Sequence, residues 1–297
     1  MSAPAPARAP APRRVVTVLT HQRPGQVAEA LALLVEAARE SGVTLCLDAA
    51  ETAKHCLDPD PDGVVVTDDA PAGEVTLCVV LGGDGTILKG LRQYAGTGVP
   101  VFAVNFGEVG FLATVEPEEL DTGTLRRAFE GEFDVLHLPA ITFETANGAF
   151  HKAINDVSFQ RKVGGRVARL SYGVAGEEVG SVRCDGLVVC TPAGSTGYNL
   201  ANGGPVLAWG VEGFGVSFIA PHSLTARALV VAPTDVLTVS NQGREAIDVS
   251  VDGRPVCEIA PGEDIDASFE TNTTLLAQLP GSSFYKRLRA KFGRLSS

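Results

Sequence analysis

The sequence has few aromatic residues and no excess of positive charge. Aromatic side chains make up 6% of its 297 residues, with a single Trp, and the formal net charge is −11. Single-stranded nucleic acids are bound by aromatic stacking within positively charged grooves, and duplexes by basic surfaces. The composition therefore argues against a broad nucleic-acid-binding face. It leaves room for a small anionic ligand, which a few local cations and backbone N–H groups can hold.

Metal-binding cysteine patterns are also missing. The six cysteines form no CxxC pair, and no His stands at metal-ligand spacing; zinc sites need such clusters. Cys78 and Cys190 lie in apolar runs, where a reduced, buried thiol is expected. This usage favours a reducing compartment and predicts a cytoplasmic protein.

Long apolar runs are absent as well. No stretch approaches the ~20 residues that a transmembrane helix needs, so we expect no membrane contact. The Ala/Pro-rich start, residues 1–13, lacks the apolar core of a signal peptide and is predicted to be disordered. Apolar residues at 45% and charged residues at 20% are typical of a soluble protein with a sizeable core.

Two periodicities predict two domains. Over residues 14–130, β-branched runs alternate with helix-period segments, as in a parallel sheet covered by helices. The expected strands are 14–20, 43–47, 74–81 and 99–104, and the expected helices are 26–41, 87–94 and 117–130.

Over residues 131–275, short alternating runs separated by Gly, Asn and Pro predict a β-rich, β-sandwich-like domain of two packed sheets. Its expected strands include 140–145, 168–174, 186–191, 216–220, 236–240 and 247–251. The C-terminal segment, 276–297, contains the basic, helix-compatible run 284–292, which we expect to pack back on the N-terminal domain.

A glycine-rich loop follows the buried strand 74–81. Gly82, Gly83 and Gly85 surround Asp84, and Thr86 follows. Glycines let the backbone turn sharply and approach a ligand, and the next helix offers free N–H groups to phosphates. A carboxylate beside such an anion site could deprotonate a hydroxyl nucleophile or organise Mg²⁺. A tight strand–helix turn with a capping Asp is the alternative interpretation.

A second motif runs from Asp185-Gly186 through Thr191–Tyr198 (TPAGSTGY) to Gly203-Gly204-Pro205. A strand leads into a loop of small and hydroxyl residues, which can hydrogen-bond a ribose or a carboxamide. Tyr198 can pack on a flat ring. A Gly/Ser/Thr-rich hairpin connection is the alternative.

These motifs resemble those of the NAD kinase family. GGDGT after a buried strand is the signature of the NAD kinase and diacylglycerol kinase-like superfamily, with a close cousin in phosphofructokinases. The second motif is similar to the family's DG…TPTGSTAY…GGP, with Ala193 and Gly197 as departures to smaller residues.

Three further segments occur in the family's order, and the resemblance runs from about residue 14 to 292. Residues 105–112 are similar to NxGxLGFL, with Val109 in place of Leu, and residues 221–227 to PHxLxxR. Asn155-Asp156 matches an Asn-Glu/Asp pair. Phe111 stands where an adenine-contacting aromatic is expected, and a core Phe is the alternative.

The resemblance implies an NAD kinase-like fold and a defined reaction. The γ-phosphoryl group of ATP, or another phosphoryl donor, passes to the 2′-hydroxyl of the adenosine ribose of NAD, forming NADP. Asp84 would be the base, Mg²⁺ would be bound through the nucleotide, and NAD would lie between the two domains. The donor phosphates are expected at Gly82, Gly83, Gly85 and Thr86. The NAD-binding residues implied are Asp84, Gly85, Phe111, Asn155, Asp156, Arg169, Arg183, Asp185, Thr196, Gly197, Tyr198, Ala201 and Arg254.

The family usually forms homodimers or homotetramers, in which Asp185 would reach a neighbour's site. Two alternatives stay open: a lipid kinase of the same superfamily, and a non-catalytic NADP(H) sensor. The sequence does not distinguish ATP from polyphosphate as donor, or NAD from NADH as acceptor.

Overall fold

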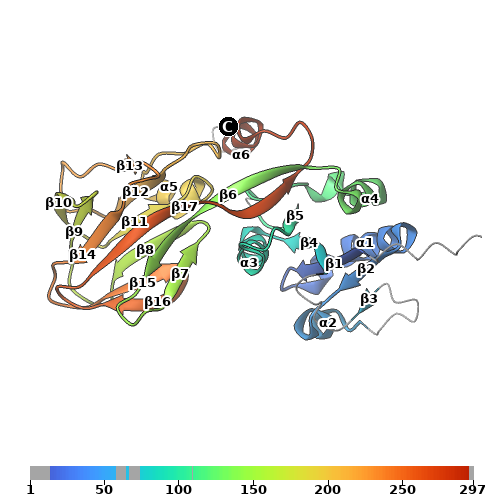
Figure 1. Cartoon of the computed structure of the whole chain (residues 1–297), viewed down its shortest axis with the longest axis horizontal. Helices are drawn as coiled ribbons and strands as arrows, with labels where there is room; N and C mark the ends of the chain where they lie inside the picture. Colours follow the sequence, from blue (N-terminus) through green and yellow to red (C-terminus); the bar gives the residue numbers. More distant parts are fainter. Residues whose placement is uncertain (1–13, 58–64, 67–73, 109, 294–297) are drawn as a thin grey trace, which may run out of the picture. The chain divides into compact units, whose positions relative to one another are not determined.

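The computed structural model describes residues 14–57, 65–66, 74–108 and 110–293 (Figure 1). The predicted disordered tail, 1–13, and Val109 lie outside the described residues. The chain forms two compact units, one of Met1–Thr86 with Val99–Phe133 and one of Ile87–Gly98 with Asp134–Ser297.

The first unit contains a parallel sheet, as predicted. Its strand order is β5-β4-β1-β2-β3, and every pairing is parallel. Residues of β4 are buried almost throughout, which is typical of a parallel strand with both faces covered. The strands are β1 (Arg14–Thr20), β2 (Val43–Cys46), β3 (Val65–Val66), β4 (Val75–Gly82) and β5 (Pro100–Asn105).

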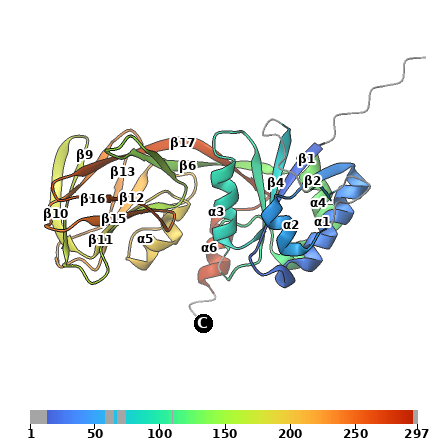
Figure 2. The same ribbon diagram turned by 90° about the horizontal axis from the view of Figure 1, so that it is seen from below.

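Helices α1 (Ala28–Ser41) and α4 (Thr122–Glu130) lie side by side in this unit (Figures 1 and 2). Short 3₁₀ turns precede them at Pro24–Gln26 and Pro117–Glu119. Gly42 ends α1 at φ 64°, a left-handed conformation that glycine adopts without steric cost. The sequence did not indicate α2 (Ala49–His55), whose N-cap, Asp48, accepts the Glu51 N–H.

Helix α3 spans Asp84–Gln93 and begins three residues before the predicted start at Ile87. Asp84 and Gly85 form its first turn rather than a separate loop, because the backbone already turns at Gly82-Gly83.

The second unit consists of two antiparallel sheets. One has the order β13-β12-β11-β8-β15-β16; in the other, β10-β9-β14-β17 is extended by β6, which pairs with β17 and β7. Buried apolar side chains of both sheets, among them Phe159, Leu170 and Val189, form one core. This arrangement confirms the predicted β-sandwich-like fold.

The strands of this unit are β6 (Asp134–Glu144), β7 (Phe150–Ala153), β8 (Asp156–Arg161), β9 (Ala168–Val174), β10 (Glu177–Cys184), β11 (Gly186–Cys190), β12 (Phe214–Ile219), β13 (Leu229–Val231), β14 (Leu237–Asn241), β15 (Ile247–Val251), β16 (Arg254–Ile259) and β17 (Asp264–Gln278). A 3₁₀ turn (Gly194–Thr196) and α5 (Tyr198–Ala201) follow β11.

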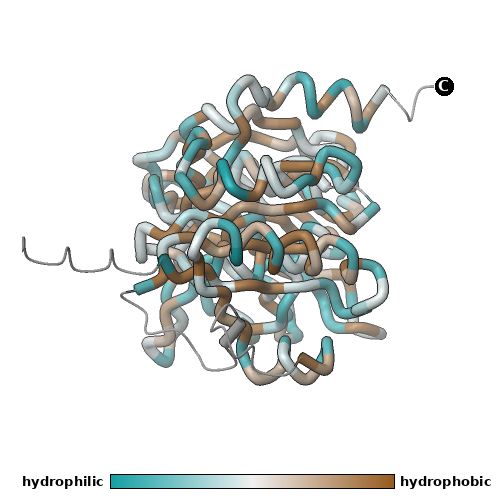
Figure 3. Tube along the Cα trace, turned by 90° about the vertical axis from the view of Figure 1, so that its right-hand side faces the viewer, coloured by the Kyte–Doolittle hydropathy of each residue, from teal (hydrophilic) through white to brown (hydrophobic). Residues whose placement is uncertain are grey.

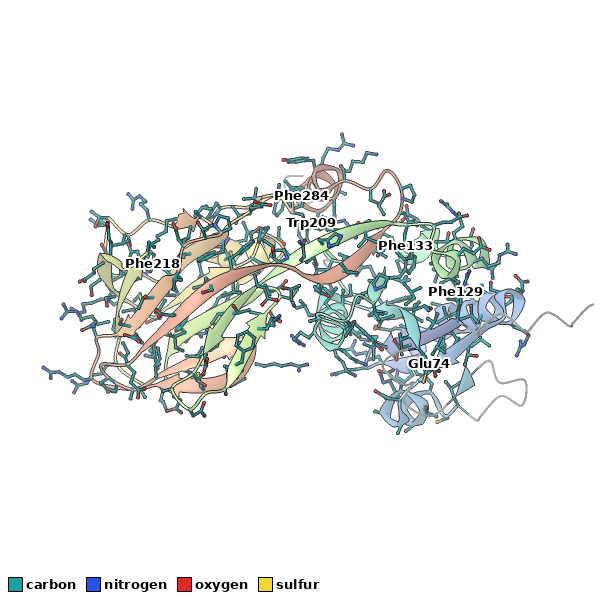
Figure 4. All side chains as sticks on the ribbon, in the orientation of Figure 1. Glu74, Phe129, Phe133, Trp209, Phe218 and Phe284 are labelled. Carbon is teal, nitrogen blue, oxygen red and sulfur yellow. The ribbon has the colours of Figure 1, made fainter. Side chains whose placement is uncertain are left out.

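Helix α6 (Phe284–Phe292) confirms the predicted C-terminal helix. Its polar and apolar residues alternate along the tube that leads to the C-terminus in Figure 3. The ring of Phe284 lies 5.4 Å from that of Trp209, and Arg287 donates to Gln278 Oε1 at 3.1 Å. Both aromatic residues are labelled in Figure 4. Both partners belong to the second unit, so packing on the N-terminal domain stays a prediction. Among the described residues, no helix has the length and apolar character that a membrane span requires.

Candidate active site

The glycine-rich loop is built for the close approach of two backbones. A Cβ on Gly107 would lie 2.8 Å from the Cα of Gly83, so only glycines let these two loops touch. A Cβ on Gly82 would meet the Thr86 side chain at 2.7 Å. Gly85, in contrast, is exposed, and a Cβ there would meet nothing within 4 Å.

The Asp84 carboxylate is held by backbone N–H groups. Its Oδ1 accepts from Leu112 at 3.1 Å and its Oδ2 from Phe111 at 3.3 Å. Phe111 thus reaches Asp84 through its N–H, and the residue is only 5% exposed. The predicted contact of this ring with adenine stays a prediction.

The segment that holds Asp84 is shaped by Asn105, for which the sequence suggested no separate role. Asn105 is 4% exposed; its Oδ1 accepts the Gly107 N–H at 3.0 Å, and its Nδ2 donates to Glu116 at 2.9 Å. Gly110 adopts φ 63°, and a Cβ there would collide with the Asn105 side chain. Asn105 thus directs the chain back toward Asp84.

In the second unit, the Asn155-Asp156 pair stands at the start of β8. The Asp252 carboxylate accepts three successive N–H groups: that of Ile154 at 3.3 Å, that of Asn155 at 2.7 Å and that of Asp156 at 3.2 Å. The Asp252 N–H returns a hydrogen bond to the Asp156 carbonyl at 2.9 Å.

Thr191 holds the same segment from the other side. Its hydroxyl donates to the Ile154 carbonyl at 2.6 Å, and its N–H donates to the Asn155 carbonyl at 2.9 Å. All six backbone polar groups of Ile154–Asp156 are therefore satisfied by two residues, Thr191 and Asp252, as buried backbone requires.

Asp252 lies in the two-residue turn between β15 and β16. Asp252 and Gly253 adopt φ 46° and 74°, the left-handed pair that an Asp-Gly hairpin turn favours. The Asp252 side chain is 0% exposed, and Arg92 of α3 donates to it at 3.0 Å. The sequence alone predicted neither the hydrogen bonds of the Asp252 carboxylate nor its ion pair with Arg92.

The buried hydroxyls of the 191–198 loop, those of Thr191 and Ser195, bind other groups of the chain. The Gly194 N–H donates to the Thr191 hydroxyl at 3.1 Å, and Ser195 Oγ donates to the Pro192 carbonyl at 2.7 Å. A Cβ on Gly194 would lie 2.1 Å from the Asn155 carbonyl oxygen. These two hydroxyls are therefore engaged with the chain itself, and hydrogen bonding of the loop to a ribose or a carboxamide stays a prediction. The predicted ligand residues that retain exposure are Thr196, Gly197, Tyr198 and Ala201.

The carboxylates of Asp156 and Asp185 determine the electrostatic environment of Tyr198 in this loop. Burial, reinforced by the charge of Asp252, raises the pKa of Asp156 to about 7. Burial also raises the pKa of Tyr198, and the charges of Asp156 and Asp185 add to this effect. Tyr198 therefore lies within electrostatic reach of both acids.

Asp185 lies at the other end of β11 from Thr191 and pairs with Arg161. Arg161 Nε is 2.6 Å from Asp185 Oδ1, and this contact lowers the pKa of Asp185. Arg161 ends β8 and Asp156 begins it, so their Cα atoms are about 17 Å apart along an extended strand. Sequence reasoning missed Arg161; its signal is a cation at the end of an otherwise buried strand.

Beside this pair is a cavity of about 570 Å³ with basic walls. Arg169 and Arg183, predicted to be near phosphates, lie directly opposite each other on β9 and β10, and both line it. The other basic residues of its wall are Arg161, Lys162, Arg166 and Arg244, and its carboxylate is that of Glu245. Arg254 is exposed at the start of β16. Among the described residues, no group of three or more His, Cys, Asp or Glu is arranged to hold a metal.

Comparisons with known proteins agree with these motifs. A family model described as the ATP-NAD kinase N-terminal domain matches residues 10–133, and one described as the ATP-NAD kinase C-terminal domain matches residues 154–273. An NAD kinase of Gemmatimonas aurantiaca is 35% identical over 238 residues, which cover 78% of this chain and 81% of that protein. An NAD kinase of Acidobacterium capsulatum is 33% identical over 257 residues, covering 80% and 88%.

Solved structures share the fold. Yeast NADH kinase in complex with NADH superposes with a TM-score of 0.85 at 22% identity, over 97% of this chain and 90% of that chain. An NAD kinase from Archaeoglobus fulgidus in complex with ATP gives 0.70 at 25% identity, over 95% and 98%. Since both family models match, and relatives above 30% identity cover more than two thirds of the chain, the chain belongs to the NAD kinase family.

Proposed function

We propose that the protein is an NAD kinase that transfers the γ-phosphoryl group of ATP to the 2′-hydroxyl of the adenosine ribose of NAD. The observation that carries the proposal is the setting of Asp84. Its carboxylate is fixed by two N–H groups at the start of a helix, in a loop whose glycines exclude side chains.

Asp84 accepts the proton of the 2′-hydroxyl. Each carboxylate oxygen carries two lone pairs, so an oxygen that accepts one N–H can also accept the ribose hydroxyl. As the proton moves to Asp84, the ribose oxygen forms a bond to the γ-phosphorus, the bond to the β,γ-bridging oxygen breaks, and ADP leaves. A positioned base contributes roughly 10²–10⁴-fold to such a rate.

The donor phosphates bind at Gly82, Gly83, Gly85 and Thr86. The first turn of α3 begins at Asp84, and a helix N-terminus presents N–H groups and a positive dipole end to anions. Mg²⁺ bound with the nucleotide would supply positive charge that offsets the negative charge of the phosphates. Asp84 is the carboxylate of this loop that would be available to coordinate Mg²⁺ through an oxygen.

The dinucleotide contacts Asn155 and Asp156, with Thr196, Gly197, Tyr198 and Ala201 from the loop after β11 and with Phe111 and Arg254. The Asn155 Oδ1 atom is buried and has no hydrogen-bond partner within the described chain. An acceptor in this state costs free energy until a donor reaches it. A ligand amide or hydroxyl is such a donor.

Arg169 and Arg183 lie near the phosphates of the dinucleotide, and Asp185 serves the active site of a second copy in a homodimer or homotetramer. Asp185 pairs with Arg161 at one end of β8, and Asp156 lies at the other end, about 17 Å away along the strand. The arginine-lined cavity beside Asp185 supplies charge for phosphates. The six free thiols accord with a cytoplasmic location.

An endpoint assay tests the proposal. Purified protein is incubated with NAD, ATP and Mg²⁺, and NADP is measured with a dehydrogenase specific for NADP; parallel reactions replace ATP by polyphosphate and NAD by NADH. Formation of NADP supports the proposal. Binding of NADP without its formation from any donor would indicate a non-catalytic sensor instead, and phosphorylation of diacylglycerol without NADP formation would indicate a lipid kinase.

A further inference from the structure

The Asp-Gly turn between β15 and β16 requires no carboxylate. Asn-Gly forms the same two-residue turn at least as well as Asp-Gly, because Asn also tolerates positive φ. Yet the Asp252 side chain is fully buried and accepts four donors. The presence of a carboxylate at this buried position therefore calls for another explanation than turn formation.

The four donors divide between the two carboxylate oxygens. Oδ1 accepts the N–H groups of Asn155 and Asp156, and Oδ2 accepts that of Ile154 and the Arg92 guanidinium at 3.0 Å. An ionised carboxylate offers about four lone pairs and no donor, so this set of partners matches its ionised form.

A negative charge at this depth needs a nearby cation. Asp156 is also buried, and the charge of Asp252 contributes to raising its pKa to about 7. Within the described chain, Arg92 is the basic side chain that is ion-paired with Asp252, and its own side chain is only 20% exposed. Buried charges that lose their partner become strongly unfavourable.

We propose that Arg92 is a positioning residue for dinucleotide binding: it holds the Asp252 carboxylate, which in turn holds the backbone of Ile154–Asp156 and so orients Asn155 and Asp156. This proposal rests on the proposed function of the Asn155-Asp156 pair. Arg92 acts through Asp252 and contacts neither of the two residues by a hydrogen bond of its own in the described structure.

Three variants test the proposal. Arg92→Met keeps the length of the side chain and removes its charge, whereas Arg92→Lys keeps the charge and can retain one hydrogen bond. Asp252→Asn keeps the turn, but it replaces one carboxylate oxygen by an NH₂ group, which cannot accept from the N–H groups and the guanidinium that face it. Arg126→Met is the matched control, because Arg126 makes an exposed ion pair with Glu40 and such pairs contribute little.

Hydrogen exchange of a peptide covering residues 153–157 provides a readout that is independent of turnover. We expect exchange at least about tenfold faster in Arg92→Met and Asp252→Asn, since hydrogen bonds to a charged acceptor are lost or weakened. The Kd and KM for NAD should rise by about tenfold, while the KM for ATP stays within about twofold. Arg92→Lys should lie closer to the wild type, and Arg126→Met should match it.

Unchanged exchange and unchanged NAD affinity in Arg92→Met would overturn the proposal, as would an equal rise of both KM values. If Arg92→Met does not fold, the comparison of Asp252→Asn with Arg92→Lys decides: a defect in the first and not in the second supports the proposal, and wild-type behaviour of both contradicts it. If the wild-type protein makes no NADP, the proposed function is refuted. The role of Arg92 is then still tested by hydrogen exchange and by NAD binding, since neither depends on turnover.

Discussion

The Thr191 hydroxyl donates to the Ile154 carbonyl oxygen at 2.6 Å, and it accepts the Gly194 N–H at 3.1 Å. One buried side chain thereby joins the loop after β11 to the segment that presents Asn155 and Asp156. The Thr191 hydroxyl consequently acts on the backbone of a neighbouring segment.

Replacing Thr191 by Val should destabilise the protein by about 2 kcal/mol, because an isosteric methyl leaves a buried carbonyl and a buried N–H without their partner. Urea unfolding measures this change. Thr238→Val is the control, since the Thr238 hydroxyl makes a solvent-exposed bond to Asp266 and its loss should cost no more than about 0.5 kcal/mol. Equal effects of the two substitutions would contradict the role given to Thr191.

Gly194→Ala should impair NAD binding. The added Cβ would lie 2.1 Å from the Asn155 carbonyl oxygen, a backbone atom that cannot rotate away. Overpacking of this kind costs roughly 1–3 kcal/mol and would displace Asn155. Gly210→Ala is the control, because a Cβ on Gly210 meets nothing within 4 Å. Calorimetric titration with NAD separates the two variants; wild-type affinity in Gly194→Ala would speak against the tight approach.

The contribution of Asp156 to the stability of the protein should fall as pH rises from about 4 to about 7. Its pKa in the folded state is raised to about 7, whereas in the unfolded chain it is near 3.9. The folded state therefore keeps a proton that the unfolded state has lost, so this contribution to stability is complete below the lower value and lost above the higher one. Asp156→Asn should flatten that part of the pH dependence, by an amount on the order of a few kcal/mol.

Thermal unfolding of the wild type and Asp156→Asn at pH 5 and pH 8 measures the difference. If the Asp156 carboxylate accepts a ribose hydroxyl, kcat/KM for NAD should also rise through about pH 7 in the wild type only. Parallel pH profiles of the two proteins would show that Asp156 does not titrate in this range.

Shared active sites can be detected by complementation. Asp84→Asn and Asp185→Asn should each be inactive or impaired alone. Coexpressed in one oligomer, they should restore about a quarter of wild-type activity, because half of the sites in half of the dimers combine an intact Asp84 with an intact Asp185. No recovery in purified mixed oligomers would place Asp185 in the site of its own chain or outside any site.

Regular elements with strong periodicity were predictable from the sequence. The β-branched run Arg14–Thr20 and the alternating runs Ala168–Val174 and Ile247–Val251 are strands with the predicted bounds. Helix α2 was missed because seven residues carry too little helical periodicity. Strand β17 was missed because its polar stretch 270–274, interrupted by a register shift, is typical of a loop.

The residues of the candidate site were likewise predictable from the sequence only in part. Asp84, Asn155 and Asp156 were predictable because glycine spacing and short motifs mark them. The residues that hold them were not. Asp252 and Thr191 act on the backbone of a segment distant in sequence, and Asn105 acts on the Gly107 N–H and the Glu116 side chain, bonds that no short motif marks. Arg92 had a weak signal: it stands four residues after the buried Leu88, at the edge of the apolar face of α3.

The turnover of Asp84→Asn tests the central claim most directly, when NAD affinity is measured on the same preparation. The substitution keeps the shape of the side chain but removes its ability to accept a proton. We predict that NADP formation falls by at least about 10²-fold, while calorimetry shows NAD binding within a few-fold of the wild type and circular dichroism shows an unchanged fold. Turnover near the wild-type rate in the folded variant would contradict the assignment of Asp84 as the base.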